Sequence, residues 1–299
     1  MMDEKRDRED NDDSARDLSR RDFVAMSLAA GLAAAAGSAS AAEMPVVETN
    51  VDVKTPDGVC NAAFIHPTTG AHPAVIVWAD AFGLRPALRD MGKRLAAEGY
   101  SVLVPNPYYR LTRDPGIDTA TFNFQNPTDR AKLTPLMGSV NAAGAAERDG
   151  VAFVAFLDAQ RQVDKAKKVG AQGYCMGGAL VMRTVAAAPG RMGAGASFHG
   201  GGLVTDKPDS PHLLAPKIRA RMYVGVAAND DQRQPDAKDK LKAAFAAATS
   251  PAEIEVYSNA QHGWCMTDMP APAGMPIYSK PDAERAWAKL VALYKTALT

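Results

Sequence analysis

The stretch GYCMGG at residues 173–178 lies between a predicted strand at residues 168–174 and a helical pattern at residues 178–187. Its G-x-C-x-G pattern between a strand and a helix is that of a nucleophile elbow, with Cys where Ser is usual. The glycines are needed because side chains two positions from the nucleophile would collide with the neighbouring strand and helix. The elbow also places Cys175 at a helix N-terminus, where the dipole and free N–H groups favour a thiolate. The stretch therefore predicts a cysteine nucleophile.

Apolar runs alternate with helical patterns along the rest of the chain. Two short alternating segments, residues 48–54 and 59–65, flank a Pro-Asp-Gly turn and predict an antiparallel hairpin. Residues 105–140 show little periodicity and predict a long loop or cap over the sheet edge. The alternation predicts an α/β fold in one domain, with a mostly parallel sheet and helices on both faces. The predicted strands are residues 74–78, 100–104, 168–174, 194–198, 221–226 and 253–257, and the predicted helices are residues 86–98, 142–163, 178–187, 237–247 and 282–297.

An elbow nucleophile needs a base, and two candidate partners follow it in the chain. In α/β-hydrolases the nucleophile, the acid and the histidine come in that order, each on a loop after a strand. Asp230 and Asp231 follow one predicted strand, and His262 follows the next. His262 would take the thiol proton or stand as an imidazolium beside the thiolate, while an aspartate fixes its tautomer. We prefer Asp230, the first acidic residue past the strand, with Asp231 as the alternative.

The oxyanion hole is expected to consist of two backbone N–H groups. One belongs to Met176, directly after the nucleophile, and the other to the loop after residues 74–78, where Ala81 is the natural donor. The same loop places the Asp80 carboxylate at the mouth of the site, unless this side chain only caps a turn.

Three further side chains are candidates for contact with substrate. Phe82 and Trp264 lie close to the predicted site in sequence and are expected to form apolar walls. His199 follows the predicted strand at residues 194–198. It either lines the pocket or is a structural histidine, and the sequence leaves both interpretations open.

These motifs together resemble the dienelactone hydrolase family: Cys175 in GYCMGG, the DAFG loop at Asp80, the acid at Asp230 and His262 in HGW. The resemblance covers residues from about 45 to 299. It implies a hydrolase that needs no metal or other cofactor and cleaves a lactone or carboxylic ester through an acyl-thioester. In the family a carboxylate at the Asp80 position, usually Glu, contacts the resting thiol and takes its proton when substrate binds. Asp80 is one methylene shorter, which leaves direct contact with Cys175 open.

The family member that opens dienelactone binds the substrate carboxylate with two arginines. Arg110 matches the first, but Met266 stands at the second position. Losing one charge-assisted contact would weaken recognition of that anion by about 1–3 kcal/mol. Dienelactone is then one candidate among small-molecule lactones and esters. A broad carboxylesterase or thioesterase, and a non-catalytic ligand-binding protein with this fold, stay as alternatives.

The first 41 residues differ in composition from the rest. A charged stretch leads to paired arginines at residues 20–21, an apolar run at residues 25–36 and an A-x-A site at residues 39–41. This pattern resembles a twin-arginine export signal, the alternative being a disordered acidic tail before a packed helix. We expect the twin-arginine export machinery as a partner and cleavage near residue 41. The product would be a periplasmic or secreted enzyme with no stable membrane anchor, since the apolar run is too short to span a bilayer comfortably.

The bulk composition fits an ordinary globular protein of 299 residues, 46% hydrophobic and 23% charged. Residues 42–299 carry 28 basic and 25 acidic side chains, a net charge of about +3 that is too weak a bias to indicate nucleic-acid binding. Three cysteines make no disulfide framework and show no metal-ligand spacing. Whether Cys60 and Cys265 are bridged stays open.

Overall fold

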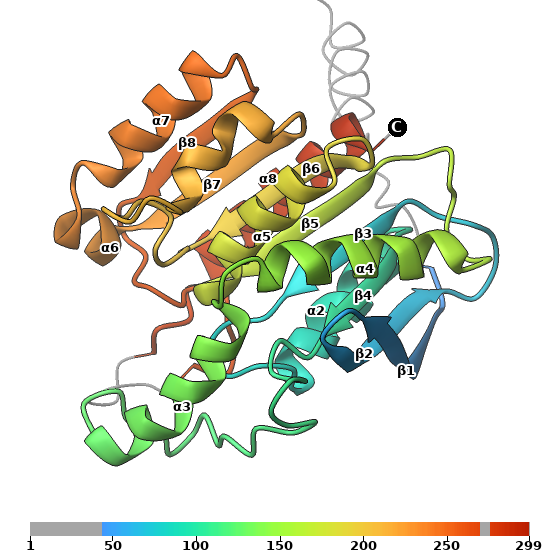
Figure 1. Cartoon of the computed structure of the whole chain (residues 1–299), viewed down its shortest axis with the longest axis horizontal. Coiled ribbons are helices and arrows are strands. Elements are labelled where there is room, and N and C mark those ends of the chain that lie inside the picture. The colour runs from blue at the N-terminus through green and yellow to red at the C-terminus, as the bar shows by residue number, and fades with distance from the viewer. Residues whose placement is uncertain (1–43, 270–275, 299) are drawn as a thin grey trace, which may run out of the picture. The chain divides into compact units, whose positions relative to one another are not determined.

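The computed structural model describes residues 44–269 and 276–298 (Figure 1). The predicted export signal at residues 1–41 lies outside the described residues. Within the described residues, eight strands form one sheet in the order β1-β2-β4-β3-β5-β6-β7-β8. The strands are β1 (Val46–Thr55), β2 (Gly58–Pro67), β3 (Ala74–Trp78), β4 (Ser101–Pro105), β5 (Val169–Tyr174), β6 (Met192–Phe198), β7 (Arg221–Ala227) and β8 (Ala252–Tyr257).

The pairing of the strands agrees with the predicted α/β fold. β1 and β2 form the expected antiparallel hairpin, and β2 also pairs antiparallel with β4. Every other neighbouring pair, from β4 through β8, is parallel. Strands β3 and β4 are buried along their whole length, which explains their unbroken apolar sequences. The predicted sheet is therefore confirmed, and it brings the carboxyl ends of β3 and β5 to β8 to one edge.

Helices pack on both faces of the sheet (Figure 1). The core on one face includes side chains of α4, α5 and α7, and the core on the other includes side chains of α2 and α8. Within the described residues, no helix has the length and apolar character needed to cross a membrane. The helices are α2 (Pro86–Ala97), α3 (Pro127–Val140), α4 (Ala145–Ala159), α5 (Met176–Ala187), η1 (Pro211–Lys217), α6 (Ala228–Arg233), α7 (Ala237–Ala247) and α8 (Lys280–Ala297).

The segment that was expected to be a long loop, residues 105–140, contains the helix α3. Its start is well defined, because Pro127 is the first helical residue and the Asn126 side chain accepts a hydrogen bond from the Thr128 N–H at 2.9 Å. The helix has Pro135 in its interior and buries only Leu133, Leu136 and Val140. So few apolar contacts give a weak helical pattern, and the loop prediction was wrong for residues 127–140.

Candidate active site

Cys175 lies between the end of β5 and the start of α5, as the elbow motif predicts. Its backbone has φ 52° and ψ −115°, a conformation that is strained for a residue with a side chain. A Cβ atom on Gly173 would lie 2.2 Å from the Gly177 carbonyl oxygen, and one on Gly177 would lie 2.6 Å from the Trp78 carbonyl oxygen. Both glycines are therefore required for the close approach of β3, β5 and α5.

Gly177→Ala is expected to lower the free energy of unfolding by about 1–3 kcal/mol or more, because backbone must move to admit the methyl group. The matched control is Gly190→Ala, where an added Cβ meets nothing within 4 Å. That change is expected to stay within about 0.5 kcal/mol. Urea unfolding of both variants checks this, and equal midpoints would contradict the close packing of the elbow.

His262 and Asp230 are in direct contact at the same sheet edge. His262 Nδ1 lies 2.6 Å from Asp230 Oδ2, and the His262 backbone N–H donates to Asn229 Oδ1 at 2.9 Å. Asp231 points elsewhere and accepts a hydrogen bond from Lys238 Nζ at 2.8 Å. Asp230 was expected on a loop, but it belongs to the short helix α6. Of the two candidate acids, the structure places only Asp230 against His262.

The surroundings of His262 favour its charged form. Burial opposes the charge, but the interactions with Asp230 and with Cys175 outweigh burial and raise the pKa of His262 to about 10. The imidazole is therefore protonated at neutral pH. A cation held between a carboxylate and the Cys175 thiol is the arrangement that supports a thiolate nucleophile.

This raised pKa predicts a pH-dependent contribution to stability. The folded pKa of His262 exceeds its ordinary value of 6.5, so the folded state binds its proton more tightly than the unfolded chain. The contribution is fully present below pH 6.5 and is lost as the pH rises through about 10. We expect the stability difference between the wild type and His262→Gln to shrink over that interval in urea unfolding. A difference that grew with pH would contradict the assignment.

Asp80 does not point freely into the site, because Arg85 holds it. Both Asp80 carboxylate oxygens accept from Arg85, at 2.7 and 2.9 Å, and Oδ1 also accepts from the Phe82 N–H at 2.9 Å. Arg85 makes a second bidentate pair with Asp268, on the loop after His262. No hydrogen bond joins Asp80 to Cys175 in the part of the chain that the structure describes. Arg85 and Asp268 had no place in the sequence-based site.

Arg85→Met is expected to lower the free energy of unfolding by about 3–5 kcal/mol, because it leaves the Asp80 carboxylate buried without its cation. Asp80 is only 1% exposed in this pair. Arg113→Met is the control, since the pair of Arg113 and Asp52 is 63% and 56% exposed and should contribute about 0–1 kcal/mol. Thermal or urea unfolding of both variants measures the difference, and similar losses would show that the Arg85 pair is no more stabilising than a surface pair.

The two expected oxyanion donors both have free N–H groups. Met176 is the first residue of α5, so its N–H has no acceptor within the helix. Among the described residues, the Ala81 N–H donates no hydrogen bond either. The Tyr108 hydroxyl, which sequence reasoning missed, donates to the Ala81 carbonyl oxygen at 2.7 Å and so fixes the orientation of this loop.

Arg110 was expected to bind substrate, but the structure places it in an ion-pair network outside the pocket at Cys175. Its Nη2 lies 2.7 Å from Asp57 in the β1–β2 turn and 2.7 Å from Asp149 on α4. The guanidinium also stacks on the Tyr109 ring, 4.6 Å from its centroid. Each of the three guanidinium nitrogens donates to Asp57 or Asp149, so two carboxylates already occupy the N–H groups that a substrate anion would need.

The three other expected contacts are buried side chains. Phe82 packs edge-on against Phe122, with ring centroids 5.2 Å apart. Trp264 stacks on Tyr257 at 4.7 Å and is fully buried. His199 is also fully buried, so of the two interpretations left open for it, the structural one agrees with its position. None of the three lines the pocket that contains Cys175.

A pocket of about 440 Å³ opens beside Cys175. Ala179 and Arg183 lie four and eight residues after Cys175, so the helical period of α5 puts them on one face with Cys175. That spacing could have indicated both residues from sequence. Met137, on α3, comes from the segment that was expected to cap the sheet edge. The lining residues are Met137, Asn141, Cys175, Met176, Ala179, Arg183, Gly201, Gly202, Thr205, Lys207, Asp209 and Pro211.

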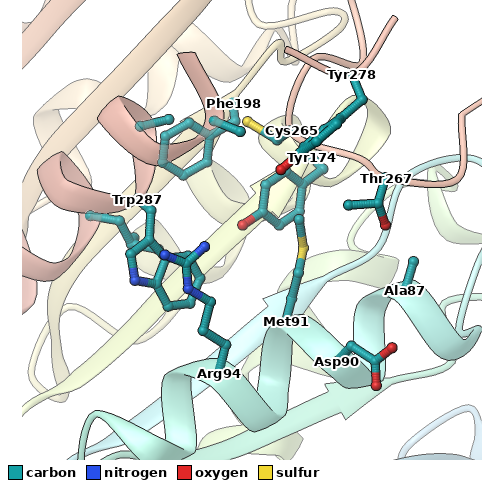
Figure 2. Close-up of a pocket in the computed structure, with 13 residues that line it drawn as sticks. Ala87, Asp90, Met91, Arg94, Tyr174, Phe198, Cys265, Thr267, Tyr278 and Trp287 are labelled. Atoms are coloured by element: carbon teal, nitrogen blue, oxygen red, sulfur yellow. The ribbon is translucent and has the colours of Figure 1, made fainter. Parts of the chain in front are cut away.

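A second, apolar pocket of about 180 Å³ lies on the other face of the sheet, between α2 and α8 (Figure 2). Tyr174 and Phe198 form part of its wall, together with Trp287 and the Cys265 thiol. Burial raises the pKa of Cys265, and no histidine lines this pocket. The pocket therefore lacks the base that accompanies the elbow. All three cysteines are free, with Cys60 and Cys265 packed in the cores on opposite faces of the sheet.

Residues 61–298 match the model of the Dienelactone hydrolase family. The chain belongs to the dienelactone hydrolase family. Carboxymethylenebutenolidase from Rhodococcus opacus is 25% identical to this chain over 254 residues, covering 82% of this chain and 90% of the relative. A relative from Methylorubrum extorquens, provisionally named carboxymethylenebutenolidase, is 29% identical over 288 residues and covers 91% of each chain. The family expected from the motifs is confirmed, and membership makes the chain a hydrolase.

Solved structures of dienelactone hydrolases share the fold of this family member. One from Klebsiella pneumoniae, provisionally named, superposes with a TM-score of 0.69 at 24% identity and covers 84% of this chain and 99% of its own. One from Anabaena variabilis gives a TM-score of 0.59 at 18% identity and covers 85% and 99%. At these identities the similarity shows the α/β-hydrolase fold, in agreement with the sheet described above.

Within the described residues, His, Cys, Asp and Glu side chains form no group of three that could hold a metal ion.

Proposed function

We propose that this protein hydrolyses a lactone or carboxylic ester through Cys175, with His262 and Asp230 as the other members of a triad. The observation that carries the proposal is the contact of His262 Nδ1 with Asp230 at 2.6 Å, which leaves the rest of the ring to interact with the thiol of a strained elbow. Asp230 fixes the tautomer of His262, and the helix N-terminus supports the thiolate.

In the proposed reaction, the Cys175 sulfur attacks the substrate carbonyl carbon and the carbonyl electrons move onto oxygen. The N–H groups of Met176 and Ala81 stabilise that oxyanion. When the intermediate collapses, the C–O bond to the alcohol breaks, and the departing oxygen takes a proton from His262. Water then attacks the acyl-thioester while His262 accepts one of its protons, which releases the carboxylic acid and the free cysteine.

The size of the pocket at Cys175 favours a substrate with a small acyl or alcohol group over a polymeric substrate. Its volume of about 440 Å³ lies in the usual range of small-molecule sites. Met137, Met176 and Ala179 supply apolar contacts, and Arg183 lines the same space. A lactone ring, or the acid portion of a simple ester, fits these dimensions and this mixture of surfaces.

A broad carboxylesterase or thioesterase activity is the second candidate, and one observation favours it. The two arginines with which the dienelactone-opening relative binds its carboxylate have no free counterpart at the matching positions. Arg110 is engaged by Asp57 and Asp149, and Met266 is a fully buried apolar side chain. Dienelactone would then be one substrate among neutral esters, lactones and thioesters.

The test is rapid mixing of the purified protein with an activated aryl ester, followed by an acid quench within seconds and intact mass measurement. The expected result is a transient acyl adduct that peptide mapping assigns to Cys175. Hydrolysis rates for dienelactone, neutral lactones, aryl esters and acyl-thioesters then separate the two candidates. No adduct and no turnover with any of these substrates would favour the non-catalytic ligand-binding alternative.

We also propose export by the twin-arginine machinery, on the basis of the pattern at residues 20–41. A folded reporter fused after residues 1–41 should appear in the periplasm of a bacterial host. Replacing Arg20 and Arg21 with Lys should keep it in the cytoplasm. Equal export of both fusions would reject this route.

A further inference from the structure

His199 is a buried histidine whose ring contacts both proposed reactive residues. It follows β6, next to β5, and Tyr174 pairs with Phe198 in the parallel register of these strands. Cys175 and His199 therefore leave neighbouring strands side by side, and both have positive φ values, 52° and 41°. The His199 side chain is shielded from solvent and so cannot contact the substrate directly.

The segment that contains His199 holds the backbone of the elbow on both sides. The Cys175 N–H donates to the Phe198 carbonyl oxygen at 3.1 Å and to His199 Nδ1, also at 3.1 Å. The Gly201 N–H donates to the Cys175 carbonyl oxygen at 3.0 Å. A strained backbone conformation persists only where several surrounding contacts hold it. Three of those contacts come from residues 198–201, and one of them is a side-chain acceptor.

This acceptor role fixes the protonation state of His199. Nδ1 accepts a hydrogen bond and must carry no proton, so the neutral ring carries its proton on Nε2. Burial, and then the charge on His262, lower the pKa of His199 well below its ordinary value. Nε2 is buried and has no hydrogen-bond partner among the described residues. A second proton, added on Nδ1, would remove the bond to Cys175 and place a second cation beside His262.

The same ring packs edge-to-face against the proposed base. The ring centroids of His199 and His262 lie 4.9 Å apart with an interplanar angle of 62°, and Trp264 packs on His199 at 5.1 Å. His262 is thus in contact with Asp230 at Nδ1 and with the His199 ring at one side. One neutral side chain therefore contacts the nucleophile's backbone and the base's ring at the same time.

We propose that His199 is a positioning residue, which holds the strained Cys175 elbow through Nδ1 and sets the distance of His262 from the thiol. The proposal rests on the proposed function of Cys175 and His262. Loss of the Nδ1 acceptor lets the elbow relax and moves the thiol away from His262. A displacement of about 1 Å in an active site costs up to about 100-fold in rate.

His199→Leu and His199→Asn form the test pair. Leu has a similar volume and no acceptor, whereas Asn places Oδ1 close to the position of Nδ1 and tolerates positive φ. We expect His199→Leu to lower kcat for an aryl ester by about 10- to 100-fold with little change in KM. Its rate of Cys175 alkylation by iodoacetamide should reach half-maximum at a higher pH than in the wild type. His199→Asn should recover most of kcat and the wild-type alkylation profile.

Two outcomes with folded variants would overturn the proposal: a Leu variant with wild-type kcat and alkylation profile, or an Asn variant as impaired as the Leu variant. If the Leu variant does not fold, NMR of wild-type protein with ¹⁵N-labelled histidine tests the proposal through the protonation of the two ring nitrogens of His199. The expected spectrum shows an unprotonated Nδ1 and a protonated Nε2 for His199 from pH 6 to 9, and a protonated Nδ1 rejects the proposal. Neither alkylation nor NMR needs an ester substrate, so a failure of the proposed hydrolysis would be seen separately, as a wild type without an acyl adduct.

Discussion

Cys175→Ala is expected to abolish the acyl adduct and to lower kcat for an aryl ester by about 10⁴- to 10⁶-fold, the order of loss found when a member of a catalytic triad is removed. The methyl group of Ala cannot attack a carbonyl, and His262 alone cannot form the covalent intermediate. The residual rate would come from the oxyanion donors and from substrate binding. Phenol release and intact mass, followed in the same samples, measure both parts of the prediction.

Cys60→Ala and Cys265→Ala are matched controls, because each removes one thiol without touching the elbow. Burial raises the pKa of Cys60 to about 12 and also raises that of Cys265, so neither thiol is a nucleophile at neutral pH. Both variants should keep the adduct and the wild-type rate if they fold. Equal rates of phenol release from Cys175→Ala and the wild type would contradict the cysteine mechanism.

The positions of Cys175 and His262 were predictable from sequence because they depend on local patterns and on a general property of parallel sheets. The elbow motif indicates Cys175 as the candidate nucleophile, and β3, β5 and β7 are recognisable in the sequence as buried strands. Once the strands are parallel, the residues after β5, β7 and β8 must meet at one edge. Their order in the chain then indicates the acid and the histidine without any knowledge of distances.

The ion pairs of the site were not predictable, because they join segments that are far apart in sequence. Arg85 and Asp268 are 183 residues apart, and nothing in either local pattern indicates that they meet. The partner of Arg110 could not be predicted either, although the position of Arg110 matches a substrate-binding arginine of the family. In the fold, Asp149 lies 39 residues away along the chain but 2.7 Å from the guanidinium. A motif gives the position of a charge but not the partner that neutralises it.

The residues that line the pocket at Cys175 were predictable only in part. Arg183 lies eight residues after Cys175, so the helical period of α5 predicts its place beside Cys175 once the elbow motif has been recognised. Met137 depends on α3, whose few buried positions and internal Pro135 give little helical pattern. The sequence predicted a loop or cap at residues 105–140, but it could not predict which side chains of that segment line the pocket at Cys175.

Asp230→Asn is expected to lower kcat by about 10⁴-fold, a loss typical of replacing a triad aspartate by its amide. Asp230 Oδ2 lies 2.6 Å from His262 Nδ1, where a carboxylate oxygen accepts a hydrogen bond from the ring N–H. An amide that presents its NH₂ group to Nδ1 would favour the other tautomer, with the proton on the nitrogen that should face the thiol. The stabilising carboxylate charge beside the imidazolium would be lost as well. Steady-state kinetics with an aryl ester measures the effect.

Asp231→Asn is the control, because Asp231 is the adjacent carboxylate and its side chain is bound to Lys238 Nζ at 2.8 Å instead of to His262. We expect this change to leave kcat close to the wild-type value and to alter stability by no more than about 1 kcal/mol, as for other partly exposed ion pairs. A large loss for Asp231→Asn with a small one for Asp230→Asn would mean that α6 rearranges when substrate binds. Similar small losses for both would mean that His262 works without a carboxylate partner.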